Sequence, residues 1–231
     1  MAGFFITGTD TGVGKTWVAL ALMHALQTQG LHVLGMKPVA TGCDWIDGEL
    51  RNEDALLLQR QASRILPYSQ VNPYAYQLPV APDIAAKREN FPVNIDHIVA
   101  QCRVLEASAD SVLVEGVGGW TVPLGESVKV ADMALCLKLP VILVVGLRLG
   151  CINHALLTWD AMVRSGVTVA GWVASECERS FEFSDETLVT LQREMNIACI
   201  TRVFAISRND LLSQINFNAD AMAKILPRMW G

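Results

Sequence analysis

A glycine-rich loop between a short apolar run and a helical pattern limits most strongly what this chain can fold into. The loop covers residues 8–16 and reads Gly-Thr-Asp-Thr-Gly-Val-Gly-Lys-Thr. It follows the apolar residues 3–8 and precedes residues 18–25, whose apolar side chains recur at helical spacing. A strand, a glycine loop and a helix in this order are typical of a phosphate-binding loop, because backbone N–H groups and the helix N-terminus bind a polyphosphate.

The chemistry of the loop side chains points to a nucleotide. Lys15 is placed to reach the terminal phosphates, and Thr16 to bind Mg²⁺. A glycine turn that merely starts a helix does not account for both Lys15 and Thr16. One departure from the common pattern is that Gly8 and Gly14 enclose five residues where that pattern encloses four. The predicted nucleotide-binding residues of the loop are Thr11, Gly12, Val13, Gly14, Lys15 and Thr16.

Further apolar runs predict a parallel sheet. Unbroken apolar runs indicate strands that are buried on both faces, and helical patterns lie between them. We therefore predict one doubly wound α/β domain over residues 1–231, with a mostly parallel sheet and helices on both faces, of the P-loop NTPase type. The predicted strands are Gly3–Gly8, Val33–Val39, Ser111–Glu115, Pro140–Gly146, Val167–Ala174 and Ala198–Phe204. The proline-rich segment Pro67–Pro92 is expected to be a surface excursion near a site.

Composition narrows the class of protein. The net charge of −5 argues against a surface that tracks nucleic acid or anionic lipid. The longest strongly apolar run, 139–147, is shorter than the ~20 residues that span a membrane. Without a basic leader, the chain is expected to be cytoplasmic, and its six scattered cysteines to be mostly reduced.

A carboxylate at a second strand end predicts a metal site. Glu115 ends an apolar strand and precedes a loop that contains Gly116 and Gly118, so its side chain is expected at the carboxyl edge where such sheets bind ligands. A strand-end carboxylate alone is often a solvated turn residue. Together with Lys15 and Thr16, it is expected to hold Mg²⁺, and Gly118 to lie beside the nucleotide.

Two other segments carry candidate site residues. Pro38 keeps Lys37 extended at the end of the second strand, which predicts a second cation near the phosphates. Asp54 follows Asn52 in the expected first turn of a helix, where acids are favoured in any case, so its role stays open between metal ligand and helix start. Residues 149–154 join a strand to a helix whose free N–H groups could bind a carboxylate, although Asn153 could equally be only a cap.

Taken together, these motifs resemble the dethiobiotin synthetase family over about residues 3–174. The six-residue spacing of the loop is this family's form. The motifs are Gly-Thr-Asp-Thr-x-Val-Gly-Lys-Thr at 8–16, Lys-Pro-Val at 37–39, Leu-Arg-Asn-x-Asp-Ala at 50–55, Val-Asn-Pro-Tyr at 71–74, Val-Glu-Gly-x-Gly-Gly-Trp at 114–120, and Leu-Pro-Val-Ile-Leu-Val-Val-Gly at 139–146 followed by Leu-Gly-Cys-Ile-Asn-His-Ala at 149–155.

The resemblance implies a homodimeric enzyme that uses ATP and CO₂ to close the ureido ring of 7,8-diaminononanoate. It implies that Lys15 and Lys37 are catalytic, and that Lys37 also contacts the carbamate. The metal ligands would be Thr16, Asp54 and Glu115. Thr41 would lie near the diamine, and Gly150, Cys151, Ile152 and Asn153 would bind the substrate carboxylate from the neighbouring subunit.

The chain also departs from the family pattern towards its C-terminus. Ser175 stands where the family has an asparagine that reads adenine, and residues 201–204 replace a Gly-x-x-Pro near the nucleotide. An aromatic that helps to enclose the substrate is replaced near Thr187. These departures predict either a remodelled nucleotide half or a diverged paralogue, and a relaxed choice of base at Ser175.

Two other functions fit a P-loop chain. One is a switch ATPase that controls a protein or membrane partner, but such proteins carry an extra lysine early in the loop, and residues 9–13 have none. Another is a different amide- or carbamate-forming ligase of the same superfamily. The three are distinguished by whether ADP formation depends on diamine and bicarbonate, on glutamine or ammonia, or on a protein partner.

Overall fold

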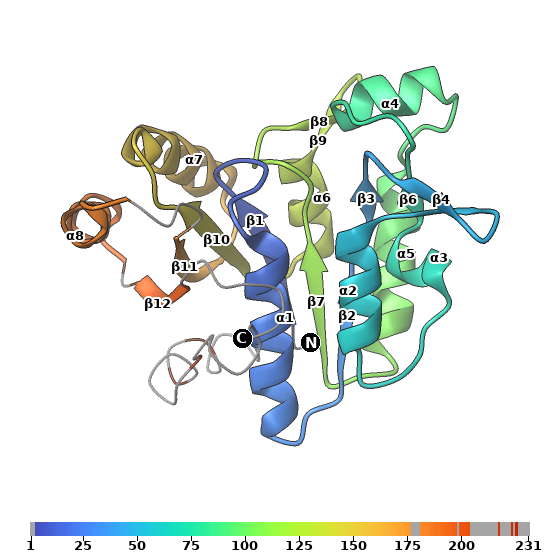
Figure 1. Cartoon of the computed structure of the whole chain (residues 1–231), viewed down its shortest axis with the longest axis horizontal. Helices are drawn as coiled ribbons and strands as arrows, with labels where there is room; N and C mark the ends of the chain where they lie inside the picture. The colour runs from blue at the N-terminus through green and yellow to red at the C-terminus, as the bar shows by residue number, and fades with distance from the viewer. Residues whose placement is uncertain are drawn as a thin grey trace.

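A computed structural model shows a six-stranded, fully parallel sheet in the order β12-β11-β10-β1-β7-β2 (Figure 1). The structure describes residues 3–176, 181–197 and 199–203, with the isolated positions 217, 223 and 225. The strands are β1 (Gly3–Gly8), β2 (Val33–Met36), β7 (Ser111–Glu115), β10 (Val141–Gly146), β11 (Val169–Ser175) and β12 (Cys199–Val203). The predicted doubly wound α/β class is confirmed.

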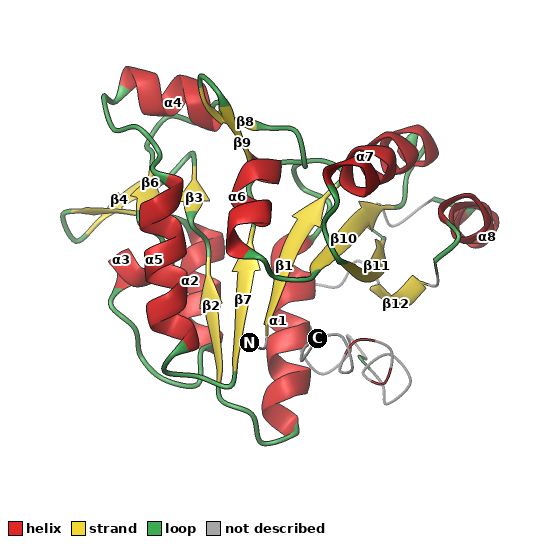
Figure 2. Ribbon diagram, turned by 180° about the vertical axis from the view of Figure 1, so that it is seen from behind, coloured by secondary structure: helices red, strands yellow, loops and turns green. Residues whose placement is uncertain are grey.

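Helices cover both faces of this sheet (Figures 1 and 2). The helices α1 (Lys15–Thr28) and α2 (Glu53–Gln61) pack together on one face. The other face carries α5 (Ile95–Glu106), α6 (Val130–Leu137), α7 (Cys151–Ser165) and α8 (Ser184–Met195). The strands β1, β7 and β10 are buried along their whole length, because helices cover both faces of the sheet there.

Shorter elements surround the main sheet. They are β3 (Val39–Ala40), β4 (Asp44–Ile46), β5 (Glu49–Arg51), α3 (Tyr68–Val71), β6 (Tyr74–Ala75), α4 (Pro82–Arg88), β8 (Pro123–Gly125) and β9 (Val128–Lys129). Their strands form three separate two-stranded sheets, β3-β6, β4-β5 and β8-β9. The second strand was expected to reach Val39 but ends at Met36, because Pro38 has no N–H and the Lys37 N–H bonds to Val71 O instead.

The expectation that Pro67–Pro92 is a surface excursion is wrong for much of its length. Val71 and Tyr76 are fully buried, and β6 pairs in parallel with β3. Pro67 and Pro82 stand at helix starts, where a missing N–H costs nothing. These two prolines therefore mark element boundaries within a segment that packs against the second strand region.

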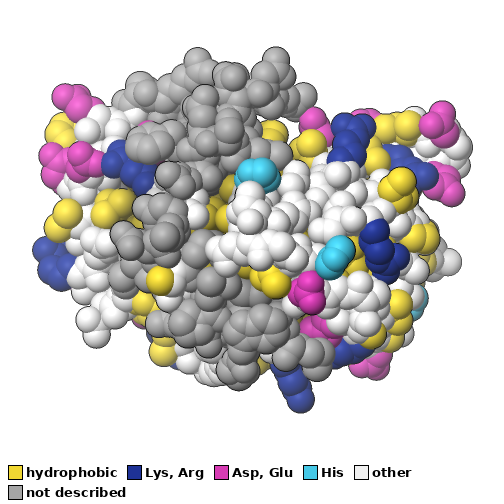
Figure 3. Space-filling model, turned by 90° about the horizontal axis from the view of Figure 1, so that it is seen from below, with side chains coloured by type: hydrophobic (Ala, Val, Ile, Leu, Met, Phe, Trp, Pro, Cys, Tyr) yellow, Lys and Arg dark blue, Asp and Glu magenta, His cyan; other side chains and the backbone are white. Residues whose placement is uncertain are grey.

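The described surface carries charges of both signs. On the face seen in Figure 3, Lys and Arg side chains are interspersed with Asp and Glu side chains. Among the described helices, none has both the length and the apolar character that crossing a membrane requires.

Candidate active site

The phosphate loop joins β1 to α1 and depends on glycine at two positions. Gly12 and Gly14 have φ values of +74° and +91°, in the left-handed region that favours glycine. Gly14 also lacks room for a side chain, since a Cβ there would lie 2.6 Å from Ser175 Oγ. Val13 is buried in the core, so any contact that it makes with a nucleotide would come from its backbone.

Lys15 extends over its own loop. Its Nζ donates to Asp10 O at 2.8 Å and to Gly118 O at 2.7 Å. Burial, with the nearby charge of Lys37, lowers the pKa of Lys15 to about 8. Asp10 in turn accepts from Arg148 Nη2 at 2.6 Å, so the loop is tied to the segment that follows β10. Among the described residues, the Lys15 ammonium donates hydrogen bonds to carbonyl oxygens only, and an incoming phosphate could therefore displace these contacts.

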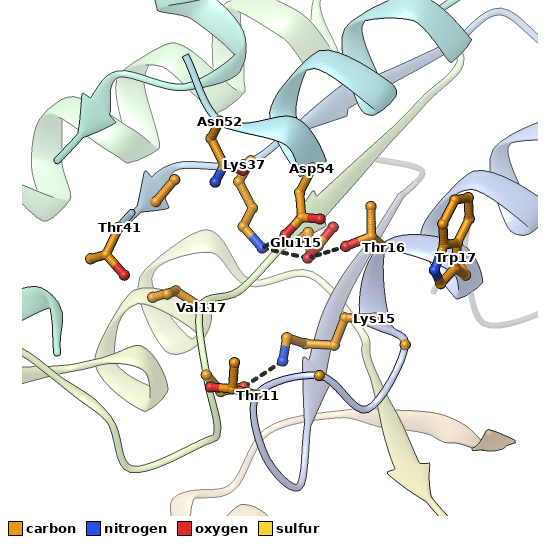
Figure 4. A pocket seen from close by; sticks show the side chains of 14 residues that line it. Thr11, Lys15, Thr16, Trp17, Lys37, Thr41, Asn52, Asp54, Glu115 and Val117 are labelled. Atoms are coloured by element: carbon orange, nitrogen blue, oxygen red, sulfur yellow. Dashed lines mark hydrogen bonds and ion pairs between the residues drawn. The ribbon is translucent and has the colours of Figure 1, made fainter. Parts of the chain in front are cut away.

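Lys37 lies at the centre of a buried charge cluster (Figure 4). The residue is only 4% exposed. Its Nζ contacts Glu115 Oε1 and donates to Asp54 Oδ2 and to Gly116 O, both at 3.2 Å. Burial by itself lowers the pKa of Lys37, but the carboxylates of Glu115 and Asp54 outweigh it and hold the pKa above its ordinary value. Lys37 is therefore a fixed cation at neutral pH.

Thr16 and two carboxylates surround this cation. Thr16 Oγ1 donates to Glu115 Oε1 at 3.0 Å, while Glu115 Oε2 is buried and has no hydrogen-bond partner in the described part of the chain. Burial raises the pKa of Glu115, which Lys37 partly offsets. Burial also acts to raise the pKa of Asp54, but Lys37 and Thr16 outweigh it and lower that pKa.

These oxygens fit a small divalent cation. The carboxylates and the hydroxyl are hard donors of the type that Mg²⁺ prefers, and the unpartnered Glu115 Oε2 is a free acceptor. Within the described residues, no group of three or more His, Cys, Asp or Glu side chains could hold a metal ion. A cation here would therefore depend on Thr16 as well as on the carboxylates of Asp54 and Glu115.

One cavity of about 290 Å³ brings most of the predicted site residues together (Figure 4). Its predicted members are Thr11, Gly12, Gly14, Lys15, Thr16, Lys37, Thr41, Asp54, Glu115 and Gly118. No binding role was expected for the other lining residues, which are Trp17, Ala40, Asn52 and Val117. Trp17 directly follows the loop, and Asn52 is the N-cap of α2. Their positions next to predicted site residues were the signal by which the sequence could have identified them.

Asn52 caps the helix that carries Asp54. Its Oδ1 accepts from Ala55 N at 3.2 Å, as expected for an N-cap residue. The structure adds that Asp54, in the first turn of α2, contacts Lys37 directly. The account of Asp54 as only a helix-start acid thus leaves out its place in the charge cluster.

The residues Gly150–Asn153 are not among the residues that line this cavity. Gly150 is the N-cap of α7, with φ at +89°, and the exposed Asn153 lies within the helix. The alternative that Asn153 is the cap is therefore wrong, because a left-handed backbone at the N-cap suits glycine. The first turn of α7 nevertheless has N–H groups without intrahelical acceptors, as every helix does.

The residues that are expected to depart from the family pattern lie at or near the far edge of the sheet. Ser175 is buried at the end of β11 against Gly14. Arg202 of β12 contacts Ser184 Oγ and the carboxylates of Glu176 and Asp185. Thr187 is buried in α8, whereas Phe204 and residues 205–209 lie outside the described residues.

Comparison with known proteins identifies the family. The chain is 49% identical, over 84% of its length and 86% of the relative, to a protein of Aromatoleum aromaticum named ATP-dependent dethiobiotin synthetase BioD. This chain belongs to the dethiobiotin synthetase family. A Cellvibrio japonicus protein of the same name is 47% identical over 85% of this chain and 86% of that protein. A family model described as an AAA domain matches residues 2–221 of this dethiobiotin synthetase family member, beyond the 3–174 of the sequence resemblance.

Solved structures share the fold of this dethiobiotin synthetase family member. The MinC:MinD cell division protein complex of Aquifex aeolicus matches with a TM-score of 0.62 at 15% identity, over 98% of this chain and 96% of that chain. A ParA family ATPase from Chlorobium tepidum matches with a TM-score of 0.58 at 13% identity, over 99% and 98%. At such identities, these matches support the P-loop fold and say nothing of the reaction.

Proposed function

We propose that this chain closes the ureido ring of dethiobiotin from 7,8-diaminononanoate, CO₂ and ATP. One amine of the diamine attacks CO₂ and loses a proton to solvent, which gives a carbamate. A carbamate oxygen then attacks the γ-phosphorus of ATP, and the bond from that phosphorus to the β,γ-bridging oxygen breaks, which releases ADP. The second amine attacks the carbonyl carbon of the resulting anhydride, phosphate leaves, and the amine proton passes to solvent or phosphate.

The observation that carries this proposal is the charge arrangement of the cavity. Phosphoryl transfer to an anionic carbamate brings negative groups together, so positioning and charge neutralisation supply most of the catalysis. Lys15 from the loop would bind the transferring phosphoryl group. Lys37, fixed by Glu115 and Asp54, would contact both the phosphate and the carbamate. Two cations in one cavity of a family member support this reaction.

Mg²⁺ would be held by Thr16, Asp54 and Glu115, and would neutralise charge on the ATP phosphates. Glu115 would offer its unpartnered Oε2 to the ion, while its Oε1 contacts Lys37. The backbone of Thr11–Thr16 would wrap the phosphates, with Gly118 beside them. Ser175 would approach the base, since it packs on Gly14.

The substrate would lie at the opposite end of the cavity from the phosphate loop. Thr41 lines that part and would contact the diamine. The first turn of α7, Gly150–Asn153, would bind the substrate carboxylate of a neighbouring subunit, because it does not line the cavity of its own chain. The protein would then be a homodimer with shared sites. A cytoplasmic location stays a prediction.

A product assay tests the reaction directly. The purified protein is incubated with ATP, Mg²⁺, ¹³C-bicarbonate and 7,8-diaminononanoate, and dethiobiotin and ADP are measured by mass spectrometry and a coupled assay. We expect one ADP per dethiobiotin, with the label in the ureido carbon. ADP formation that continues without diamine, or that requires glutamine, ammonia or a protein partner instead, would contradict the proposal.

Mixed dimers test the shared site. In Asn153→Asp, an acid in the first turn of α7 suits the helix dipole but repels the substrate carboxylate, so the fold is kept while carboxylate binding is lost. Equal mixing with Lys15→Ala should restore about a quarter of the wild-type activity, because half of randomly exchanged dimers are mixed and each has one intact site. No recovery after verified subunit exchange would place both elements in the site of one chain.

A further inference from the structure

Two buried side chains outside the cavity, Tyr68 and Asn72, connect the two segments that carry the proposed catalytic charges. Both lie in or beside the short helix α3. Asn72 belongs to the Val-Asn-Pro-Tyr motif at 71–74, to which the proposed reaction gives no function. Tyr68 is 9% exposed and Asn72 is 3% exposed. Neither is among the residues that line the cavity, so they act, if at all, through their neighbours.

Asn72 holds the backbone at Lys37. Its Nδ2 donates to Lys37 O at 2.7 Å and, more weakly, to Tyr74 O at 3.4 Å. The Lys37 N–H donates to Val71 O at 2.8 Å. Both backbone polar groups of Lys37 are therefore taken up by α3 and its C-cap, at the point where the chain leaves β2. These bonds set the direction in which the Lys37 side chain leaves the strand.

Tyr68 holds the start of the helix that carries Asp54. Its hydroxyl accepts from Asn52 N at 2.7 Å and donates to Asn72 Oδ1 at 2.9 Å. Asn52 in turn caps α2, where Asp54 follows two residues later and contacts Lys37 Nζ at 3.2 Å. One hydroxyl thus connects the Asn52 backbone with Asn72 and, through it, with the backbone of Lys37.

We propose that Tyr68 and Asn72 are positioning residues that hold Lys37 and Asp54 in register for phosphoryl transfer. The inference rests on the proposed function, since it assigns these residues to the roles of Lys37 and Asp54 in it. Displacement of a catalytic group by about 1 Å can cost as much as 100-fold in rate. The hydrogen bonds of Tyr68 and Asn72 to the backbones of Asn52 and Lys37 prevent such a displacement.

The chemistry of the pair suits a fixed connection. Burial raises the pKa of Tyr68 to about 12, so its hydroxyl stays protonated and can donate to Asn72 while it accepts from Asn52. The Arg51 guanidinium lies over the Tyr68 ring, 4.1 Å from its centre, and covers that face of the ring. Asn72 uses both ends of its amide, which fixes its orientation.

The chain offers a matched control in Tyr76. Tyr76 lies in the same segment, is fully buried, and donates its hydroxyl to Phe91 O at 2.6 Å, away from the cavity residues. Tyr68→Phe and Tyr76→Phe each remove one hydroxyl from a buried tyrosine. Tyr68→Phe removes two hydrogen bonds and Tyr76→Phe removes one, so both should lower stability, whereas only Tyr68→Phe should disturb Lys37 and Asp54.

The test measures kcat, both KM values and the thermal midpoint for wild type and the two variants. We expect kcat to fall about tenfold or more in Tyr68→Phe, with KM for ATP within twofold of wild type because the phosphate loop is untouched. Tyr76→Phe should keep the wild-type kcat. A kcat within twofold of wild type for Tyr68→Phe, or equal losses in both tyrosine variants, would overturn the inference.

Asn72→Ala provides a second measurement of the same connection. If Tyr68 and Asn72 act as one unit, the loss of kcat in the double variant should be clearly smaller than the product of the two single losses. Multiplying losses would contradict a shared network. The wild-type assay separates this inference from the function itself: an inactive wild type refutes the proposed reaction, whereas an active wild type with a fully active Tyr68→Phe refutes only the positioning role.

Discussion

The two ends of the proposed nucleotide site are built in different ways. At the phosphate end, Lys37 and Glu115 are 4% and 1% exposed and contact each other. At the edge formed by β11 and β12, Arg202 contacts Asp185, whose side chain is 81% exposed, and Ser175 has only a short hydroxyl beside the loop. The first arrangement is interlocked and buried, whereas the second combines a buried serine with an ion pair that reaches the surface at Asp185.

This difference indicates which part of the site tolerates substitution of its side chains. A buried charge without a partner costs several kcal/mol, so a substitution among Lys37, Glu115 and their neighbours disturbs the whole cluster. An ion pair with an exposed partner contributes about 1 kcal/mol or less, so Asp185, which pairs with Arg202, can be replaced at small cost. We therefore expect the phosphoryl chemistry of the family to be retained and base recognition to be altered.

The largest predicted effect is at the phosphate end. Lys15→Ala and Lys37→Ala should each reduce kcat by at least a hundredfold, because loss of one preorganised charge stabiliser costs on the order of 3 kcal/mol. The exposed Lys87 provides a matched control, and Lys87→Ala should leave the rate unchanged. The assay is dethiobiotin formation at saturating substrates. A rate within tenfold of wild type for either variant would remove that lysine from the mechanism.

Thermal unfolding of the same variants, without nucleotide, separates the two lysines. Lys37→Ala leaves the buried Glu115 without its cation and should lower the midpoint. In the part of the chain that the structure describes, Lys15 donates to two carbonyl oxygens and to no carboxylate, and burial disfavours its charge, so Lys15→Ala should change the midpoint less. Equal destabilisation would show that the two cations are equally integrated into the fold, and would weaken the contrast.

An intermediate effect is expected from the oxygens of the proposed metal site. Glu115→Gln and Asp54→Asn each replace a carboxylate with a neutral amide, a poorer ligand for Mg²⁺. The Mg²⁺ concentration for half-maximal rate should rise roughly tenfold or more, and more in Glu115→Gln because Glu115 is the more buried oxygen donor. An unchanged Mg²⁺ titration for Asp54→Asn would return Asp54 to the role of a helix-start acid that pairs with Lys37.

The sequence predicted those parts of the molecule whose signals are local. The phosphate loop, the strand that ends at Glu115 and the cap at Asn52 each depend on a few neighbouring residues, and the structure has all three elements. Contacts between distant segments were not accessible in this way. The approach of Lys37 to Glu115 depends on β2 lying next to β7. The periodicity of apolar residues does not determine the order of strands in a sheet.

The segment 67–92 shows why a surface excursion was the wrong interpretation. Its prolines were read as loop markers, although two of them stand at helix starts. What buries Tyr68 and Asn72 is pairing of β6 with β3 and hydrogen bonding to Lys37, both of which join residues some 35 positions apart. The prediction of Asn153 as the cap was wrong for a simpler reason. Gly150 is the N-cap with a left-handed backbone, and this N-cap makes no side-chain hydrogen bond.

The smallest predicted effect concerns the base. Contacts of the phosphate loop are blind to the base, and Ser175 has one short hydroxyl where a carboxamide would offer both a donor and an acceptor. Loss of such a paired contact reduces discrimination by about 1 to 3 kcal/mol. Competition between ATP, GTP and CTP at equal Mg²⁺ should therefore give a preference for ATP of less than a hundredfold in kcat/KM, about 2.7 kcal/mol.

Two variants at position 175 sharpen this prediction. Ser175→Asn should raise the preference for ATP about fivefold, near the lower limit of about 1 kcal/mol for a restored polar pair, since its amide reaches further than the hydroxyl that lies against Gly14. Ser175→Ala should leave the preference unchanged, because a hydroxyl that does not read the base contributes nothing to discrimination. If wild type already prefers ATP by more than a hundredfold and Ser175→Ala keeps that preference, another group must read adenine. The expectation of relaxed base recognition would then be wrong, whereas the predictions for Lys15 and Lys37 would not be affected.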